Sequence, residues 1–149
     1  MSLVKSSNEL TRIKKILFVL SDVRVICHKC NNELYFYNSS IDDFMKVCKY
    51  CKTKIPITSN TIFHNVRFGL DNAFKICIDL YNSNYTFTSV DISKKYNITQ
   101  KSAWHFSNKV KINKEYIKTL NDYNIMDKKD FENHLKMKRY IIKNRLNCL

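Results

Sequence analysis

The sequence predicts an α+β protein that is mostly helical, and three observations support this fold class. Two Cys-x-x-Cys pairs flank a stretch rich in strand-forming residues. Several longer segments place apolar residues at the spacing of one helix face. Two further helical segments are short and are separated by a turn. We therefore expect an N-terminal helix (1–22), a small four-cysteine zinc ribbon (23–66), a three-helix helix-turn-helix unit (67–112) and a basic C-terminal helix (113–149).

The composition narrows the range of functions. The 149 residues carry a formal net charge of +13, and so large a surplus on a small chain usually marks a polyanionic partner. Nucleic acid is the first such partner to consider, an anionic membrane surface is the second, and a solvated basic surface without a partner is the alternative. Of these we expect double-stranded DNA. Because Gly69 is the one glycine, neither a GxGxxG nor a Walker phosphate-binding loop can be present. We expect neither a membrane nor a small-molecule substrate as a partner.

The sequence also predicts an intracellular protein. The apolar run from Ile16 to Leu20 is too short for a signal peptide or a membrane span. Cysteines spaced for metal binding suit a reducing compartment. We expect the nucleus if the source is eukaryotic, and the cytoplasm or nucleoid if it is bacterial.

The first predicted element is an amphipathic helix from Glu9 to about Leu20, capped by Ser7 or Asn8 and preceded by a frayed terminus over residues 1–6. Its apolar stripe consists of Leu10, Ile13, Ile16, Leu17 and Leu20. We expect this stripe to pack on the cysteine-containing segment or on a later helix.

The second element is a ribbon built around four cysteines. Its predicted ligands are Cys27, Cys30, Cys48 and Cys51. Each Cys-x-x-Cys turn places two thiolates on one side of a knuckle, and two facing knuckles supply the corners of a tetrahedral, structural Zn²⁺ site. A pair of disulfides and four unrelated buried thiols are the alternatives, and His28 is a competing ligand.

Strand-forming residues surround these cysteines. Val23–Ile26 predicts a strand that leads into the first knuckle, and Leu34–Tyr37 predicts a strand between the two pairs. The segment 52–64 partly alternates apolar and polar residues, so we expect an extended chain that closes the ribbon. Zinc would hold this part together, because it has too little apolar mass to fold alone.

Three helices are predicted next. The first is amphipathic and runs from Leu70 to about Asn82. Thr88 and Asp91 form an approximate capping box that begins the second helix, which ends near Tyr96.

A turn leads to the third of these helices. Asn97 can adopt the left-handed conformation that the turn needs, and Thr99 caps the helix that begins at Gln100. As the recognition helix of a helix-turn-helix, it would offer Gln and Asn to adenine and Lys to guanine or phosphate. The expected DNA-binding residues are Thr99, Gln100, Lys101, Ser102, His105, Asn108 and Lys109. The expected apolar side consists of Ala103, Trp104, Phe106 and Val110. An ordinary helical hairpin with a wet polar face is the alternative.

The last predicted element is a strongly basic helix from Lys128 to about Leu146, capped by Asp127. Its apolar stripe consists of Phe131, Leu135, Ile141 and Ile142. The helix would either lie along DNA phosphates or remain a charged, exposed helix. The residues before it, around Asp122, are predicted to be a polar linker.

The order of these motifs resembles the N-terminal region of the Merlin-type insertion-sequence transposases. The resemblance extends from about Cys27 to Val110, and its motifs are Cys48–Cys51, Ile57–His64 and Ile98–Trp104. It implies a sequence-specific DNA-binding module, with the four cysteines as zinc ligands and the helix after Thr99 as the DNA reader. Asn60 departs from the glycine of that family.

Transposases of this family continue into a DDE nuclease domain. The roughly forty residues after Val110 are too few for such a domain. We therefore expect a DNA-recognition module that is not an enzyme. The alternatives are a transcription-associated zinc-ribbon adaptor that binds a protein partner, and a truncated or fragmentary transposase. A homodimer is compatible with either DNA or protein as the partner.

Overall fold

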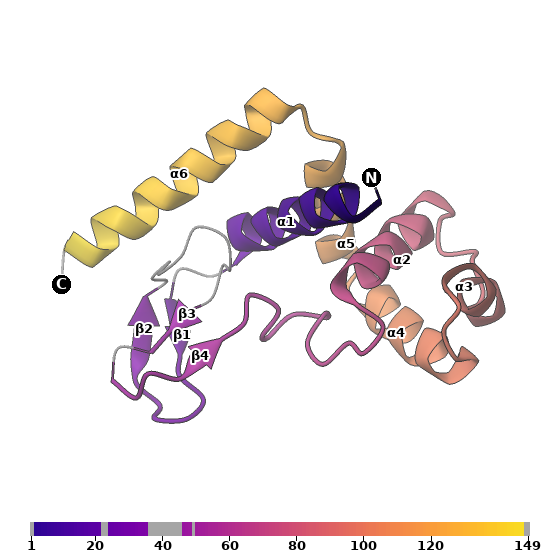
Figure 1. The fold of residues 1–149 in the computed structure, drawn as a ribbon, viewed down its shortest axis with the longest axis horizontal. Helices are drawn as coiled ribbons and strands as arrows, with labels where there is room; N and C mark the ends of the chain where they lie inside the picture. Colours follow the sequence, from indigo (N-terminus) through magenta and orange to yellow (C-terminus); the bar gives the residue numbers. More distant parts are fainter. Residues whose placement is uncertain (1, 22–23, 36–45, 49, 148–149) are drawn as a thin grey trace. The chain divides into compact units, whose positions relative to one another are not determined.

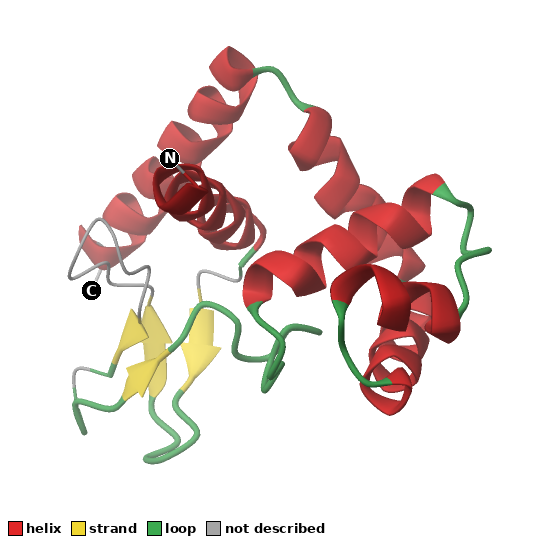
Figure 2. Cartoon of the chain, turned by 45° about the vertical axis from the view of Figure 1, so that its right-hand side comes forward, coloured by secondary structure: helices red, strands yellow, loops and turns green. Residues whose placement is uncertain are grey.

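The computed structural model describes residues 2–21, 24–35, 46–48 and 50–147. This part of the chain is an α+β structure dominated by helices, as predicted (Figure 1). Figure 2 shows the same chain by secondary structure, with the strands gathered in one small region. The chain divides into two compact units, one made of Met1–Ser59 with Met126–Leu149 and the other of Asn60–Ile125.

In the first unit, helix α1 (Ser2–Leu20) packs against helix α6 (Lys128–Asn147). The predicted stripe of α1 contributes Ile13, Ile16 and Leu17 to the core, and Phe18 is buried as well. The prediction that residues 1–6 form a frayed terminus is wrong for the described residues, because α1 begins at Ser2. Once a helix has nucleated on its buried turns, each added residue gains a backbone hydrogen bond at little further cost.

Helix α6 begins at its predicted cap. The backbone N–H of Lys129 donates to Asp127 Oδ2 at 3.1 Å. The buried side chains of α6 are Phe131, Leu135 and Ile142. Ile141 was predicted in the same stripe but is 38% exposed, because it lies a further 100° around the helix from Ile142.

Four short strands form two antiparallel pairs in the described part of this unit. Strand β1 (Arg24–Ile26) pairs with β2 (Glu33–Tyr35), and β3 (Lys46–Val47) pairs with β4 (Lys54–Ile55). Strands β1 and β2 match the predicted strands 23–26 and 34–37 in the described positions, whereas positions 23, 36 and 37 lie outside the described residues.

The expected extended chain over 52–64 is wrong beyond Ile55. Strand β4 ends before Pro56, and turns follow as far as Asn65. Proline lacks the N–H that a strand ladder needs. Asn60 and Asn65 then adopt left-handed backbone conformations, with φ of 62° and 59°. Asparagine tolerates this region better than most residues, so it supplies turns that glycine would otherwise make.

The second unit contains four helices: α2 (Leu70–Asn82), α3 (Ser89–Tyr96), α4 (Gln100–Ile112) and α5 (Lys114–Ile125). The first three have the predicted bounds to within a few residues. Helix α5 replaces the predicted polar linker. It packs on α2 and α4 and buries Ile117, Leu120 and Asn121. The buried positions recur at i, i+3 and i+4, but the polar residues between them hide this short pattern in the sequence.

Helices α3 and α4 are joined as predicted. Thr88 and Asp91 form a reciprocal capping box at the start of α3. Asn97 ends α3 in the left-handed region, with φ of 53° and ψ of 47°. The hydroxyl of Thr99 accepts the N–H of Ser102 at 3.2 Å and so caps α4. These local hydrogen bonds determine where both helices begin and end.

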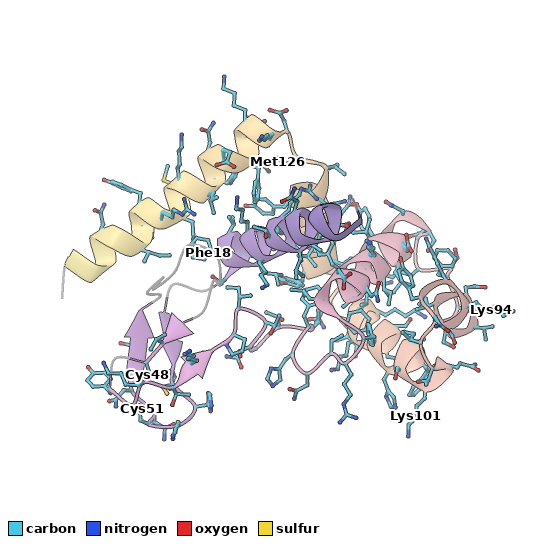
Figure 3. All side chains as sticks on the ribbon, in the orientation of Figure 1. Phe18, Cys48, Cys51, Lys94, Lys101 and Met126 are labelled. Carbon is cyan, nitrogen blue, oxygen red and sulfur yellow. The ribbon has the colours of Figure 1, made fainter. Side chains whose placement is uncertain are left out.

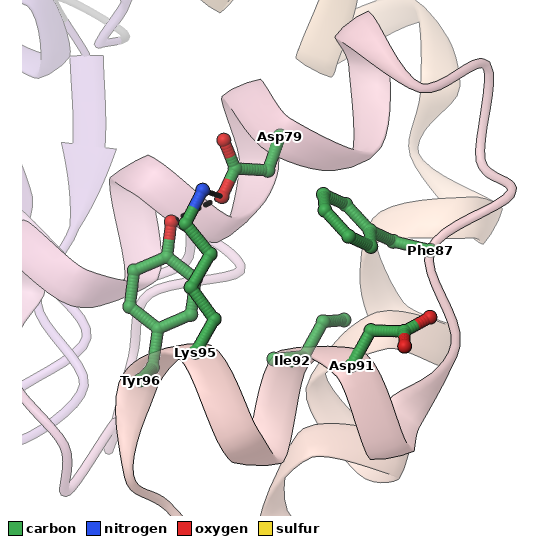
Figure 4. Close-up of a pocket in the computed structure, with 6 residues that line it drawn as sticks. All are labelled: Asp79, Phe87, Asp91, Ile92, Lys95 and Tyr96. Carbon is green, nitrogen blue, oxygen red and sulfur yellow. Dashed lines mark hydrogen bonds and ion pairs between the residues drawn. The ribbon is translucent and has the colours of Figure 1, made fainter.

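A polar contact ties α3 to α2 (Figure 4). Asp79 of α2 accepts a 2.7 Å hydrogen bond from Lys95 Nζ and another from the Tyr96 hydroxyl. Burial raises the pKa of Tyr96, and the hydrogen bond that it donates to Asp79 raises this pKa further. The phenol therefore remains a donor, and the C-terminal end of α3 is held against α2.

In the described ranges, no helix is both long and apolar enough to cross a bilayer.

Candidate metal centre and candidate nucleic-acid interface

Two backbone turns of the same design carry the four cysteines. In the turn between β1 and β2, the Cys27 N–H donates to the Asn32 carbonyl and the Asn31 N–H donates to the Cys27 carbonyl, both at 2.9 Å. The turn between β3 and β4 repeats this pattern. There the Cys48 N–H donates to Thr53 and the Lys52 N–H donates to Cys48, again at 2.9 Å.

A left-handed residue allows each turn to close. Asn31 has φ of 58° and Lys52 has φ of 61°. Glycine would adopt this conformation without strain, asparagine at little cost, and lysine at a cost of about 1 kcal/mol. Each knuckle thus folds without glycine, and the cost of doing so is larger at Lys52 than at Asn31.

The four sulfur atoms lie together. Their ligand atoms are all within 4.8 Å of one another. Cys27 Sγ is 3.7 Å from Cys51 Sγ, and Cys30 Sγ is 3.6 Å from Cys48 Sγ. A tetrahedral ion with bonds of ~2.3 Å would separate its sulfur ligands by about 3.8 Å. A disulfide would need ~2.05 Å, so the disulfide alternative is wrong and the residues fit a four-thiolate metal site.

The site is partly shielded from water. Cys27 and Cys48 are buried, and Ile55 packs with them in a small apolar cluster that Cys30 and Cys51 complete. Figure 3 shows Cys48 and Cys51 among the short strands. His28 is exposed and is not in the group of candidate ligands found among the described residues.

Hydrogen bonds favour the thiolate form of Cys30 and Cys51, the two cysteines that are only partly buried. Cys51 Sγ lies 3.0 Å from the Thr53 hydroxyl; together with a backbone bond at the same residue, this lowers the pKa of Cys51 to about 6. The backbone and side-chain N–H groups of Asn32 likewise lower the pKa of Cys30. Burial instead raises the pKa of Cys48. A bound cation would overcome this burial, because coordinated thiols lose their protons.

Sequence reasoning missed Asn32 and Thr53 as groups that bind the cysteine sulfurs. A signal for them exists, since each stands two positions after the second cysteine of its pair. Such outer hydrogen bonds orient ligands and tune their charge.

The predicted DNA-binding residues lie at and along α4, and the structure places them in three groups. Exposed side chains are Gln100, Lys101, His105 and Lys109, whereas Ser102 and Asn108 are half-buried. Lys101 projects from the helix in Figure 3. Thr99 is exposed, but its hydroxyl already caps the helix and donates to Ser102 Oγ at 2.9 Å.

Comparisons with known proteins add no family to this geometry. No family model matches the chain, and neither does any curated protein or solved structure.

Trp104 was predicted on the apolar side of α4, and this prediction is wrong. Its side chain is 54% exposed and its ring meets the ring of His105 edge to face, with centroids 5.0 Å apart. The buried face consists instead of Ala103, Phe106, Ser107 and Val110. Trp104 lies 100° from Ala103 around the helix, which takes it out of that face. Size and hydrophobicity suggested burial, but the helical angle places this indole in water.

Proposed function

We infer that this protein binds double-stranded DNA, with a structural zinc ion in its first unit and α4 as the reading helix of a helix-turn-helix. The observation that carries the inference is the capped α3–turn–α4 pair, whose second helix exposes Gln100, Lys101, His105 and Lys109. Helix α4 contains no acidic residue. It therefore offers amides that can hydrogen-bond to base edges, and cations with no negative side chain on the same helix.

Zinc is the metal that suits the cysteine cluster best. Four thiolates are soft ligands and favour a tetrahedral ion. They fill its coordination shell and leave no position open for a substrate or an activated water, so the role is structural. Binding would hold the two knuckles together.

The charge of the chain supports a polyanionic partner. The formal net charge is +13, and α4 contributes Lys101, Lys109 and Lys111. Contacts between such cations and DNA phosphates release bound counterions, which accounts for much of the affinity of DNA-binding proteins. We propose that the phosphates supply affinity and that the amide side chains of α4 supply sequence preference.

The motif order further supports a DNA-recognition module like that of the Merlin-type transposases, without the nuclease domain. The motif Ala103-Trp104 has a physical role in this proposal, because an exposed indole beside cations can contact a base or a sugar. We propose that the module has no catalytic activity of its own.

Binding of zinc-loaded protein to random-sequence duplexes tests this function. Trp104 is the one tryptophan, so its fluorescence reports on α4 directly. We expect affinity to fall steeply with added salt and repeated selection to enrich one sequence. We expect Lys101→Gln to weaken binding about tenfold and Lys118→Gln, an exposed change on α5, to leave it unchanged. A flat salt response or no enrichment would contradict the proposal.

One observation favours a protein partner as a second candidate. Helix α4 exposes two large apolar side chains, Trp104 at 54% and Ile112 at 83%. The cores of protein interfaces are enriched in such groups. An adaptor would keep its partner after Lys101→Gln but lose it after Trp104→Ala, whereas DNA binding depends on the lysine.

A further inference from the structure

A groove runs beside α4 within the second unit. It has a volume of about 190 Å³ and is formed by the segment 64–68 and by one face of α4. The helix contributes Ser102, His105, Phe106 and Lys109, which recur at the spacing of a single face. Three of these four residues were expected to contact DNA from the sequence. The segment 64–68 was not, so the groove extends the candidate interface beyond the helix.

The groove is lined by groups that attract an anion. Arg67 and Lys109 stand on opposite walls, and His64 and His105 add ring N–H donors to the same two walls. No acidic side chain is among its described lining residues. A water molecule needs only ~10–15 Å³ of such space, so a phosphate group and its hydration can enter.

The loop wall of the groove is held in place. Phe106, which is only 4% exposed, contacts Phe68 edge to face with centroids 5.4 Å apart and lies 6.3 Å from Phe63. The Phe68 carbonyl accepts a 2.9 Å hydrogen bond from Asn72 Nδ2, and the Phe63 N–H donates to Thr61 Oγ1 at 3.1 Å. These contacts fix the segment on both sides of Arg67. A preformed site loses little entropy when it binds.

The positions of the lysines around α4 indicate which anion would lie nearest to the groove. Lys101 points away from the buried face of α4. Lys109 lies about 80° around the helix from Lys101, on the side that faces the segment 64–68. If the outward face enters a major groove, the side of the helix that carries the segment 64–68 borders one DNA strand. Backbone phosphates of that strand are the anions nearest to Arg67 and Lys109.

We propose that Arg67 and Lys109 hold one backbone phosphate of bound DNA between them, so that the segment 64–68 is a second DNA-contacting element beside α4. The proposal rests on the proposed function, since it requires that the protein binds a duplex. Arginine suits the site because its planar guanidinium can donate two parallel hydrogen bonds to a phosphate.

The test measures binding of the full, zinc-loaded chain to random-sequence duplexes across a range of salt, for Arg67→Gln, Lys109→Gln, the double variant of both, and Lys118→Gln. Arg67→Gln is expected to weaken binding about tenfold and to lower the salt slope by about one. Lys118→Gln is the matched control and is expected to change neither. Because two cations on one phosphate act together, Arg67→Gln with Lys109→Gln should lose less affinity than the sum of the single losses.

The possible results separate the groove from the function on which it rests. Unchanged binding by Arg67→Gln, with steep salt dependence in the wild type, overturns the groove and leaves the DNA-binding proposal in place. Additive losses in the double variant overturn the shared phosphate. A wild type that binds no duplex overturns both. Circular dichroism of Arg67→Gln checks that the exposed substitution has left the helices folded.

Discussion

A single carboxylate organises the start of α3. Asp91 Oδ2 accepts the Thr88 N–H at 2.9 Å and the Thr88 hydroxyl at 2.8 Å. These bonds, with the backbone bond the larger cause, hold the pKa of Asp91 below its usual 3.8, and nearby Lys94 lowers it further. The exposed carboxylate therefore contributes to stability only while it is ionised.

We predict that Asp91→Asn lowers the Tm of the protein at neutral pH and has progressively less effect in acid. The folded state has the lower pKa, so the carboxylate stabilises fully above the unfolded value near 3.8, and this contribution is lost as the pH falls through the folded value. Thermal unfolding followed by circular dichroism at several pH values measures the difference. Asp122→Asn, an exposed change on α5, controls for net charge. A difference in Tm that is the same at every pH would contradict the prediction.

At the scale of an element, α5 changes how the second unit is understood. It packs against α2 and α4 and adds Ile117 and Leu120, both fully buried, to their core. The pair α3–α4 is thus supported by two helices rather than by α2 alone. Burial on α5 also determines which face of α4 remains free for a partner.

We predict that Ile117→Ala destabilises the protein by about 2–5 kcal/mol, because it leaves a cavity in a close-packed core. Lys118→Ala, the exposed neighbour, should change the free energy of unfolding by no more than about 0.5 kcal/mol. Chemical denaturation followed by helical circular dichroism compares the two. Equal effects would show that α5 does not pack as described.

At the scale of the molecule, the two units have different sources of stability. The second unit has its own apolar core, with Ile76, Leu80 and Ile92 among its buried side chains. Around the cysteines, the described strands are two or three residues long and bury little besides Ile55. Such short strands need a cross-link to persist.

Removal of metal should therefore affect one unit alone. We predict that a chelator, or Cys48→Ser, unfolds β1–β4 and abolishes stoichiometric zinc binding, while α2–α5 stay folded. Zinc content and amide NMR spectra with and without metal measure this. Cys77→Ala, a change at a buried cysteine of α2 that adds no polar group, controls for loss of a thiol. The prediction would be contradicted if the strands stayed folded without metal, or if α2–α5 unfolded together with the strands.

The sequence by itself determined the features that depend on neighbours in the chain. Caps at Thr88, Thr99 and Asp127, the left-handed turn at Asn97 and the spacing of the cysteine pairs all involve residues a few positions apart. Hydrogen bonds over such short distances form in the same way wherever the segment packs. For this reason the starts of α3, α4 and α6 and the end of α3 were predictable.

Only the tertiary structure decided which surfaces are buried. Trp104 and Ile141 are exposed, Ser107 is buried, and α5 has a partner in α2, because burial depends on what lies opposite a residue and not on its own hydrophobicity. The approach of Arg67 to the basic side of α4 has the same origin. The aromatic contacts of Phe106 bring a loop and a helix together that the sequence keeps far apart.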